Sequence, residues 1–340
     1  MNHGRSLTDP WMLGPLPVPN RVLLAPLAGI GNWFVRLQAK RYGAGMAVSE
    51  MVSSHAIHHR NARTIGEMLR IDPREHAGGP VSIQLFGEDP AIMREAAAHV
   101  VSIGADAVDI NMGCPVPKVR RTGAGAQLLA DPDLAVALAA GAVQGAGSGV
   151  PVTVKLRSGL RAGDRSGFDL AHRLVAEAGV AGIAFHPRSA AVHHKGTPDY
   201  ELASELASSL PAPVIITGGL SDARRVHEAF ESTGAAAVML ARGALGNPWI
   251  FQELLEGRDG QPGTREILDE LDWTMDRAAE HLGPERAGRY LRKFYPWYVA
   301  RLQLAPAQAR ELQRALQSAP GVDEARELLD AACRPLAGTA

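Results

Sequence analysis

The chain has 340 residues, of which 46% are hydrophobic and 21% charged, which is typical of a globular protein and leaves room for a barrel of about 250 residues plus a smaller domain. A formal net charge of −1 excludes global basicity as a sign of a polyanionic partner, so a nucleic-acid site must come from local clustering of basic residues. Two cysteines exclude a disulfide framework, and no signal-peptide-like or membrane-spanning apolar segment is evident, so we expect a cytoplasmic protein with no membrane partner.

Short apolar segments recur along most of the chain, each followed by a polar or glycine-rich turn and a helical pattern. We predict eight strands, at Val22–Ala25, Met46–Val48, Val81–Leu85, Ala107–Ile110, Val152–Val154, Gly182–Phe185, Val214–Ile216 and Ala237–Leu240. Helices are predicted between them at Trp33–Tyr42, Pro90–Val101, Asp133–Val143, Gly167–Ala178, Tyr200–Ser209 and Asp222–Glu231, and the connection between the second and third strands is less clear. This alternation predicts an α/β fold, a (β/α)8 TIM barrel, with an open doubly wound sheet as the alternative.

The alternation stops at residues 260–263, and the rest of the chain has a helical pattern. Pro296, Pro306 and Pro320 mark the expected helix boundaries. We therefore predict a barrel domain over residues 1–258 and a small all-helical domain of three or four helices over residues 259–340.

The residues at the carboxyl ends of the predicted strands are the candidates for a site, because those ends form the active-site face of a TIM barrel. In chain order they are Pro26, Leu27 and Ala28; Gln84 within the third strand; Asn111 and Cys114; Lys155 and Arg157; His186 and Arg188; Thr217, Gly218 and Gly219; and Ala241 and Arg242. Any one of them could simply mark where the chain leaves the core. Their convergence on one face favours a binding site.

The loops after the seventh and eighth strands have the features of a phosphate site. Gly218 and Gly219 let backbone N–H groups approach a phosphate closely, and Arg242 adds a cation before a short helix. A phosphate site made from these two loops recurs in TIM barrels. We therefore expect a phosphorylated cofactor or substrate there.

Lys155 follows the fifth predicted strand, and its position would suit a flavin ligand. An interior lysine is costly unless it meets negative charge or a carbonyl group. The N1–C2=O edge of a flavin becomes anionic on reduction, so Lys155 could stabilise it. Gln84 and His186 could hydrogen-bond the ring and ribityl edges, although His186 could also be a structural histidine.

Cys114 lies between Gly113 and Pro115 in a turn, where a buried structural thiol is not expected. A metal role lacks partners, because the only other cysteine is Cys333 and no Cys-x₂-Cys pattern is present. A histidine-only metal site from His55, His58, His59, His193 and His194 is a weak alternative, and we expect no metal. Without an evident catalytic triad, an acid–base role for Cys114 is favoured over a nucleophilic one.

Together these motifs resemble the tRNA-dihydrouridine synthase family of FMN enzymes, and most closely its bacterial B-type branch. The matching stretches are "RVLLAPLAGI", "AVSEMVSS", "VSIQLFGEDP", "DINMGCPVPKV", "VTVKLRSG", "FHPRSA", "VIITGGL" and "LARGALGNPWIF", of which the segment containing "NMGCP" is the most specific. The stretch "RYLRKFYPWYV" is similar to the family's C-terminal helical domain.

The resemblance implies that Cys114 protonates C5 of a uracil in the tRNA D-loop while reduced FMN delivers hydride to C6. It implies that NADPH reduces the flavin first. The implied FMN ligands are Pro26, Leu27, Ala28, Gln84, Lys155, His186, Thr217, Gly218, Gly219, Ala241 and Arg242, and the implied RNA contacts are Asn111, which would touch the flipped uridine, and Arg188.

The sequence departs from the family pattern near the expected tRNA contacts. Ala190 stands in place of an arginine, and Val192 and His194 stand in place of a glutamine and a tyrosine. Thr217 replaces an asparagine, and residues 31–32 replace a Thr-Asp pair. The flavin and Cys114 positions are unaffected, but a divergent substrate is possible and the target uridine is not assigned.

A basic cluster in the predicted helical domain fits an RNA partner. Arg286, Arg289, Arg292 and Lys293 recur at helical spacing and so are expected on one face, although such a face can also be only solvated. We therefore expect tRNA as the partner, with no protein partner evident. The alternatives are an FMN barrel acting on a small molecule, such as a dihydroorotate dehydrogenase or an ene-reductase, and an inactive RNA-binding barrel.

Overall fold

The computed structural model describes residues 4–333, which fall into two compact units. The first unit runs to Gly243 and includes Ile250–Glu256, and the second comprises Ala244–Trp249 and the chain from Gly257 onward. Among the described helices, none combines the length and apolar character needed to cross a membrane.

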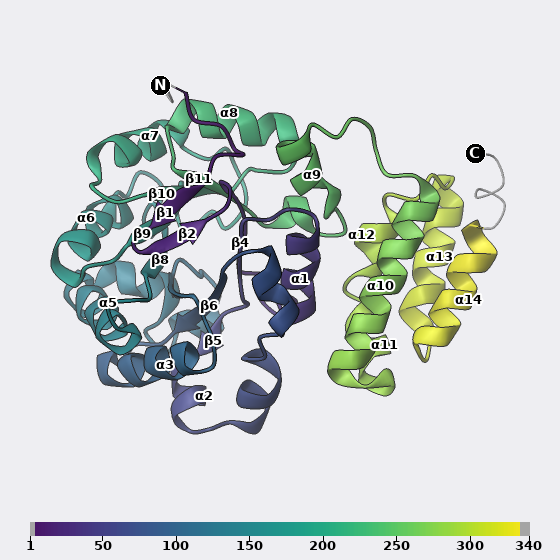
Figure 1. The fold of residues 1–340 in the computed structure, drawn as a ribbon, viewed down its shortest axis with the longest axis horizontal. Coiled ribbons are helices and arrows are strands. Elements are labelled where there is room, and N and C mark those ends of the chain that lie inside the picture. The colour runs from purple at the N-terminus through teal and green to yellow at the C-terminus, as the bar shows by residue number, and fades with distance from the viewer. Residues whose placement is uncertain (1–3, 334–340) are drawn as a thin grey trace. The chain divides into compact units, whose positions relative to one another are not determined.

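The first unit is a closed barrel of parallel strands surrounded by helices (Figure 1). The barrel strands are β3 (Val22–Leu24), β4 (Met46–Val48), β6 (Val81–Phe86), β7 (Ala107–Met112), β8 (Val152–Arg157), β9 (Gly182–His186), β10 (Val214–Thr217) and β11 (Ala237–Leu240). Each pairs with the next, and Leu23 of β3 lies opposite Met239 of β11, which joins the last strand to the first. This closure confirms the predicted TIM barrel and shows that the open-sheet alternative is wrong, because an open sheet would leave two edge strands.

Helices cover the outside of the barrel. They are α1 (Trp33–Arg41), α3 (Pro90–Ser102), α5 (Pro132–Ala146), α6 (Ser166–Ala178), α7 (Tyr200–Ser209), α8 (Ala223–Thr233) and α9 (Trp249–Glu256). Asp89 starts α3, because its Oδ1 accepts hydrogen bonds from the N–H groups of Ala91 and Ile92 at 2.8 and 3.0 Å. α3 and α5 approach closely, since a Cβ on Gly145 would lie 2.1 Å from the carbonyl oxygen of Arg94. The predicted helices are confirmed, with small shifts at their ends.

The connection between β4 and β6 was unclear from the sequence. It contains β5 (Val52–Ser53), α2 (Ser54–His58), the π-helical turn η1 (Thr64–Met68) and the 3₁₀ segment η2 (Pro73–Gly78). An ion pair with no exposed side-chain surface holds it to α1, because Arg36 Nε donates to Glu75 Oε2 at 2.7 Å. Arg36 also donates to the carbonyl oxygens of Gly31 and Arg70 at 3.2 and 2.9 Å. These extra bonds offset the desolvation of the buried pair and hold the loop after β3 in place.

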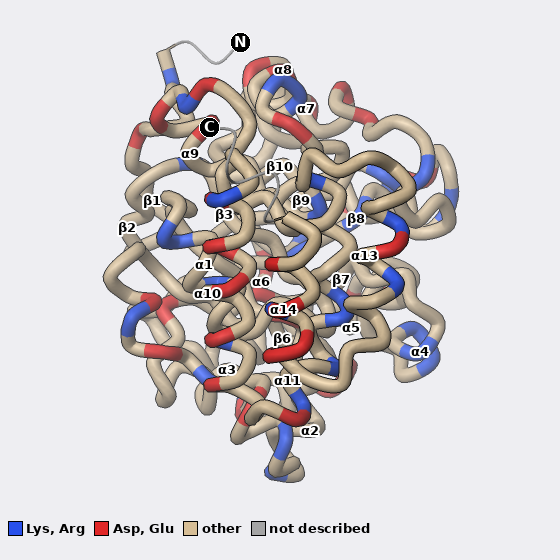
Figure 2. Tube along the Cα trace, turned by 90° about the vertical axis from the view of Figure 1, so that its right-hand side faces the viewer, with Lys and Arg blue, Asp and Glu red and all other residues tan. Residues whose placement is uncertain are grey.

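The second unit is helical in its described part (Figure 1). Its helices are α10 (Thr264–Leu282), α11 (Pro284–Leu291), α12 (Tyr295–Val299), α13 (Pro306–Ser318) and α14 (Val322–Cys333). Pro306 begins α13 and Pro320 separates α13 from α14, as predicted, but the five helices exceed the expected three or four. Figure 2 shows acidic positions along α10 and α14, and Arg326 of α14 donates to Asp272 of α10 at 2.5 Å.

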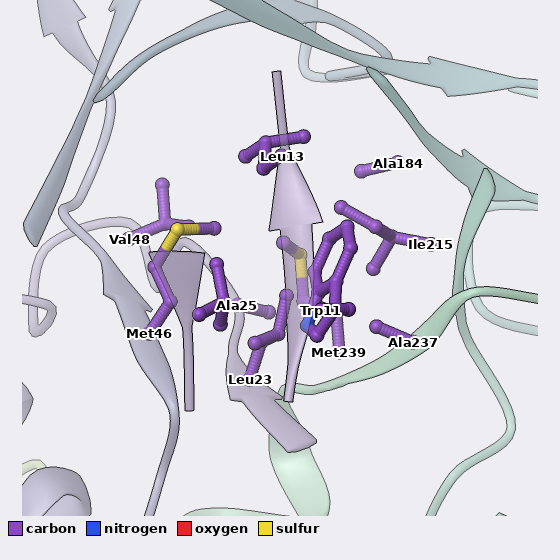
Figure 3. Packing of buried hydrophobic residues seen from close by; sticks show 11 residues of the cluster. Trp11, Leu13, Leu23, Ala25, Met46, Val48, Ala184, Ile215, Ala237 and Met239 are labelled. Carbon is purple, nitrogen blue, oxygen red and sulfur yellow. The ribbon is translucent and has the colours of Figure 1, made fainter. Parts of the chain in front are cut away.

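An N-terminal hairpin, which was not predicted, closes one end of the barrel. Its strands β1 (Trp11–Leu13) and β2 (Leu16–Val18) pair antiparallel and are too short to show a periodic pattern. Trp11 and Leu13 join a buried cluster that contains Leu23 and Ile215 (Figure 3). A Cβ on Gly182, at the start of β9, would lie 2.9 Å from Leu13 Cδ1. The hairpin therefore covers the amino ends of the strands, and the carboxyl ends are where a ligand site can form.

Candidate active site at the carboxyl end of the barrel

Several predicted site residues lie inside the strands rather than after them. Asn111 belongs to β7, Lys155 and Arg157 belong to β8, and His186 and Thr217 are the last residues of β9 and β10. The predicted ends of β7, β8, β9 and β10 came too early, because polar residues near the mouth still belong to these strands. The hydrophobic pattern therefore stops before the strand does.

Asp109 is the centre of a buried polar network that the sequence analysis missed. Its carboxylate accepts hydrogen bonds from Gln84 Nε2 at 2.6 Å and from Thr153 Oγ1 at 2.5 Å. Burial raises the pKa of Asp109 to about 6, although both hydrogen bonds and the charge of Lys155 oppose this rise. A lone charged residue inside an apolar strand was the available signal, since such residues are rarely buried without partners.

The side-chain amide of Asn111 links this network to Cys114. Its Nδ2 donates to Gln84 Oε1 at 2.9 Å and makes a long contact of 3.7 Å with Met51 Sδ. Its Oδ1 accepts hydrogen bonds from the N–H groups of Gly113 and Cys114 at 3.3 and 2.9 Å. The second N–H of the Asn111 amide makes only the weak contact with sulfur, so a ligand could replace that contact.

Lys155 lies beside this network on β8, opposite Asn111 in the strand register. Burial lowers the pKa of Lys155 to about 8, with Arg157 lowering it further and Asp109 and Cys114 raising it. Within residues 4–333 its ammonium group has no hydrogen-bond partner. A half-buried cation without a partner is costly, so the position fits one that meets an anionic or carbonyl group of a ligand.

Cys114 is half-buried, in contrast to Cys333, which is 1% exposed in α14. Its carbonyl oxygen accepts a hydrogen bond from Ala126 N–H at 3.0 Å. A Cβ on Gly125, where φ is +63°, would lie 2.9 Å from that oxygen, so the returning chain must be glycine there. The intervening segment contains α4 (Pro117–Arg120) and the 3₁₀ segment η3 (Gly125–Ala130). The thiol is thus held on a defined turn at the barrel mouth.

Arg157 ties the Cys114 turn to the loop after β9. Its Nε donates to Gly113 O at 2.9 Å, and its Nη1 donates to the carbonyl oxygens of Ser189 and His193 at 3.0 and 2.7 Å. Burial lowers the pKa of Arg157 to about 10. Nε and Nη1 of the guanidinium both bind backbone carbonyls, so Arg157 acts as a clamp between two loops.

The loop after β10 is shaped by two glycines with positive φ, Gly218 at +97° and Gly219 at +82°. A Cβ on Gly218 would lie 2.3 Å from His186 Cδ2, so the imidazole packs directly on this glycine. Tyr200 Oη donates to the Gly218 carbonyl oxygen at 2.8 Å. In the described part of the chain neither glycine N–H group is used, and exposed Arg242 lacks a hydrogen bond, which is what a phosphate site requires.

His186 and Arg188 lie next to this loop. Burial, followed by the charges of Lys155, Arg157 and Arg188, holds the pKa of His186 well below its usual value. His186 is therefore a neutral hydrogen-bonding group at pH 7. Arg188 is 9% exposed and donates from Nε and Nη2 to Gly196 O at 3.1 and 2.7 Å, so its own loop already uses much of its guanidinium.

The loop after β3 forms the remaining side of the mouth. Leu27 is 7% exposed, whereas Pro26 is half-buried and Ala28 is exposed. The turn is closed by Gly31 N–H, which donates to Leu27 O at 2.7 Å, and by Glu50, which accepts from Gly29 N–H at 2.8 Å. The leucine side chain is thus taken up by the protein core, and its backbone remains on the rim.

Comparison with known proteins agrees with this geometry. The profile of the family described as dihydrouridine synthase (Dus) matches residues 23–336. The chain belongs to this family. tRNA-dihydrouridine synthase B of Xanthomonas axonopodis pv. citri is 35% identical over 298 residues, covering 84% of this chain and 86% of the relative. The protein of the same name from Pseudomonas aeruginosa is 36% identical over 295 residues (85% and 87%), and a probable tRNA-dihydrouridine synthase 1 of Synechocystis sp. is 35% identical over 330 residues (95% and 89%).

Solved structures show likeness of fold alone. Morphinone reductase superposes with a TM-score of 0.56 at 18% identity, covering 78% of this chain and 94% of that one. An old yellow enzyme homologue from Zymomonas mobilis gives 0.55 at 14% identity, with 77% and 96% covered. The resemblance to the dihydrouridine synthase family drawn from the motifs is therefore confirmed by sequence, and the barrel by structure.

Three of the departures from the Dus pattern, at Ala190, Val192 and His194, fall on the loop after β9. Ala190 is 2% exposed and its N–H donates to Gly159 O at 2.8 Å, so this position faces the protein. The ring of His194 stacks on His186 with centroids 6.2 Å apart, and burial lowers its pKa to about 4. In this Dus chain the loop therefore adds a second neutral imidazole beside His186.

The basic residues predicted to share one face of the second unit do not all do so. Arg286, Arg289 and Lys293 are exposed, and the Lys293 ammonium lies 4.8 Å from the Tyr290 ring. Arg292 is half-buried and donates from Nη2 to Ala319 O at 3.2 Å. The reason is that α11 ends at Leu291 and the following turn redirects the side chain.

No group of histidine, cysteine, aspartate or glutamate side chains among the described residues could hold a metal ion. His55 and His58 pair instead with Glu88 and Glu95, at 2.9 and 2.7 Å. Unlike a metal site, the barrel mouth is surrounded by positive charge. Lys155, Arg157, Arg188 and Arg242 surround it, and Figure 2 shows further basic positions at α4. The excess of cations favours an anionic ligand.

Proposed function

We propose that the protein reduces a uridine in the D-loop of tRNA to dihydrouridine, with FMN bound in the barrel mouth and NADPH as the reductant. The observation that carries this proposal is the placement of Cys114, half-exposed on a defined turn, beside the unpartnered ammonium of Lys155 in a chain of the Dus family. A tRNA substrate also agrees with the cytoplasmic location expected from the low cysteine content.

The residues at the mouth fit FMN. The unused N–H groups of Gly218 and Gly219 and the cation of Arg242 suit a phosphate, and Lys155 suits the electron-rich edge of a flavin ring. The full set that would hold FMN is Pro26, Leu27, Ala28, Gln84, Lys155, His186, Thr217, Gly218, Gly219, Ala241 and Arg242. Leu27 and the buried Thr217 would contribute backbone groups rather than side chains.

Reduction of the uracil C5=C6 bond needs a hydride at C6 and a proton at C5. When bound, FMN supplies the hydride chemistry, with NADPH as the source. The Cys114 thiol supplies the proton to C5 and is afterwards reprotonated from solvent, so the two electrons and both hydrogens are accounted for. Lys155 stabilises negative charge at the ring edge, while neutral His186 can donate or accept a hydrogen bond without adding a charge.

Substrate binding requires the target base to leave its stack, which costs a few kcal/mol and less in a loop than in a duplex. Arg188 and the one weakly bonded N–H of Asn111 would contact the extruded nucleotide. Arg286, Arg289 and Lys293 of the second unit supply cations for the phosphate backbone. Arg292, which packs within its own unit, is not part of this set.

The test is to purify the protein, record its flavin absorbance and incubate it with NADPH and tRNA that lacks dihydrouridine. We expect bound flavin and a D-loop uridine converted to dihydrouridine, as read by mass spectrometry of nuclease fragments. Flavin binding without change in any tRNA would overturn the proposal in favour of a small-molecule flavin barrel. A protein that binds tRNA but no flavin would point instead to an inactive RNA-binding barrel.

A further inference from the structure

A continuous chain of side-chain hydrogen bonds runs from the floor of the barrel to the Cys114 turn. It starts at Asp109, which accepts from Thr153 and from Gln84 Nε2 at 2.5 and 2.6 Å. Gln84 Oε1 then accepts from Asn111 Nδ2 at 2.9 Å. Asn111 Oδ1 accepts in turn from the backbone N–H of Cys114 at 2.9 Å. The side chains of Asp109, Gln84 and Asn111 are at most 8% exposed, so water cannot readily replace these links.

The direction of this chain is set at both ends, because the backbone N–H groups of Gly113 and Cys114 can only donate to Asn111 Oδ1. An ionised carboxylate can only accept hydrogen bonds, so Asp109 requires Gln84 to present its NH₂ group. Gln84 must then present its oxygen to Asn111, which must present its NH₂ group to Gln84. Only in that orientation does the Asn111 oxygen face the N–H groups of Gly113 and Cys114. Turning either amide over would place two donors or two acceptors against each other in a buried site.

We propose that Asp109 is a positioning residue that fixes, through the amides of Gln84 and Asn111, the backbone turn that carries Cys114. Asp109 lies on the strand that ends at this turn, but its side chain is three hydrogen bonds away from the turn. That the position of this turn matters for catalysis rests on the proposed function. The orientation of the amides rests only on the contacts within this chain.

The proposal is tested by reversing the chain of hydrogen bonds. In Asn111→Asp, a carboxylate replaces the donor that faces Gln84, so an oxygen must face an oxygen at one of the two links. In Asp109→Asn combined with Asn111→Asp, both links of Gln84 are satisfied in the opposite direction. Position 109 then donates to Gln84, Gln84 donates to position 111, and the new carboxylate still accepts from Cys114 N–H.

The four proteins (wild type, two single variants and the double variant) are compared as the flavin-loaded enzyme by thermal unfolding. We expect Asn111→Asp to lower the melting temperature, and the double variant to melt at least about 3 °C above the sum of the two single shifts. Additive shifts would overturn the proposal. This measurement involves no tRNA, so it stands even if tRNA is not the substrate.

Uridine reduction gives the second readout. Asn111→Asp and the double variant have the same residue at position 111, so any difference between them reports on position 109. We expect Asn111→Asp to lose at least about 100-fold in uridine reduction, because misplacement of a reacting group by about 1 Å can cost that much. The double variant should recover about tenfold or more of this loss.

Asp106→Asn provides the matched control. Asp106 precedes β7 at the opposite end of the strand, where it accepts from Val81 N–H at 2.8 Å and pairs with His76. Added to Asn111→Asp, Asp106→Asn also removes one carboxylate near β7, but it leaves the hydrogen bonds of Gln84 and position 111 untouched. Recovery by Asp106→Asn equal to that by Asp109→Asn would show a general charge effect and would also overturn the proposal.

Discussion

Arg157 and Gly113 are joined by a hydrogen bond of 2.9 Å from the guanidinium Nε to the carbonyl oxygen of the residue that precedes Cys114. The same guanidinium holds the carbonyl oxygens of Ser189 and His193. One side chain therefore couples the thiol turn to the loop after β9, which carries three of the departures from the family pattern. Arg157 is the last residue of β8, so a barrel strand holds both loops.

Replacing Arg157 by methionine should lower uridine reduction by about 100-fold, because it releases the Cys114 turn and leaves three carbonyl groups without donors. The FMN content of the purified protein should stay near that of the wild type. The control is Arg161→Met, at an exposed arginine of the following loop. Steady-state rates on tRNA, measured beside flavin absorbance, provide the check, and an active Arg157→Met enzyme would show that the clamp is dispensable.

Gly218→Ala should abolish most FMN binding. The added Cβ would meet His186 Cδ2 at 2.3 Å, and the φ of +97° disfavours any side chain. Gly163→Ala is the matched control, because φ is +76° there and the Cβ would meet nothing within 4 Å. Both variants should pay the backbone cost of about 1–2 kcal/mol in stability, but only Gly218→Ala should lose FMN affinity, by about tenfold or more. Flavin fluorescence titration distinguishes them, and equal losses would contradict the phosphate assignment.

The fold was more predictable than the site, because strands leave a local hydrophobic pattern whereas the site depends on contacts between residues far apart in the sequence. The apolar segments of β4 and β11 match the observed strands because burial on both faces produces a local pattern. The role of Asp109 depends instead on Gln84 and Thr153, which come from two neighbouring strands far away in the sequence. No local pattern contains such contacts, so the residue was passed over.

The ends of elements were also hard to predict, for physical reasons that individual residues show. Lys155 and Arg157 continue β8, although their polarity suggested that the strand had ended. Arg292 was placed on the helical face of Arg289, but α11 ends one residue earlier and the turn directs its guanidinium to Ala319. In both cases the backbone path, which is set by packing elsewhere, decides where a charged side chain points.

The stability of the cofactor-free protein should depend on pH through Lys155. Its pKa is lowered from an ordinary value of 10.5 to about 8, so the folded state binds fewer protons than the unfolded state between these values. The cost of keeping this lysine protonated is present at pH 7 and is relieved as the pH rises from about 8 toward 10.5. Relative to Lys155→Met, the wild type should therefore gain up to about 3 kcal/mol in unfolding free energy over this range. Denaturant unfolding of both proteins at pH 7, 8.5 and 10 gives the comparison, and a constant difference would contradict the burial of this charge.

The basic residues of the second unit should separate into those that bind RNA and those that hold the protein together. Arg289→Gln with Lys293→Gln should weaken tRNA binding and make its salt dependence shallower, by about one unit of slope for each phosphate that is no longer neutralised. Arg292→Gln should lower the melting temperature and leave the salt dependence unchanged, since this side chain bonds to Ala319 O. Binding measured by fluorescence anisotropy over a range of salt concentrations tests both, and a larger salt effect from Arg292→Gln would reverse the assignment.

Cys114→Ala should separate the two halves of the proposed reaction. The thiol lies at the mouth but is not among the groups assigned to FMN, so the variant should bind FMN and oxidise NADPH at a normal rate. Uridine reduction should fall by at least about 100-fold, the range expected when a general acid is removed. Cys333→Ala is the control, because that thiol is buried in α14. Stopped-flow reduction of the flavin and its reoxidation by tRNA measure the two halves separately. Full reoxidation by tRNA in Cys114→Ala would mean that another group supplies the proton at C5.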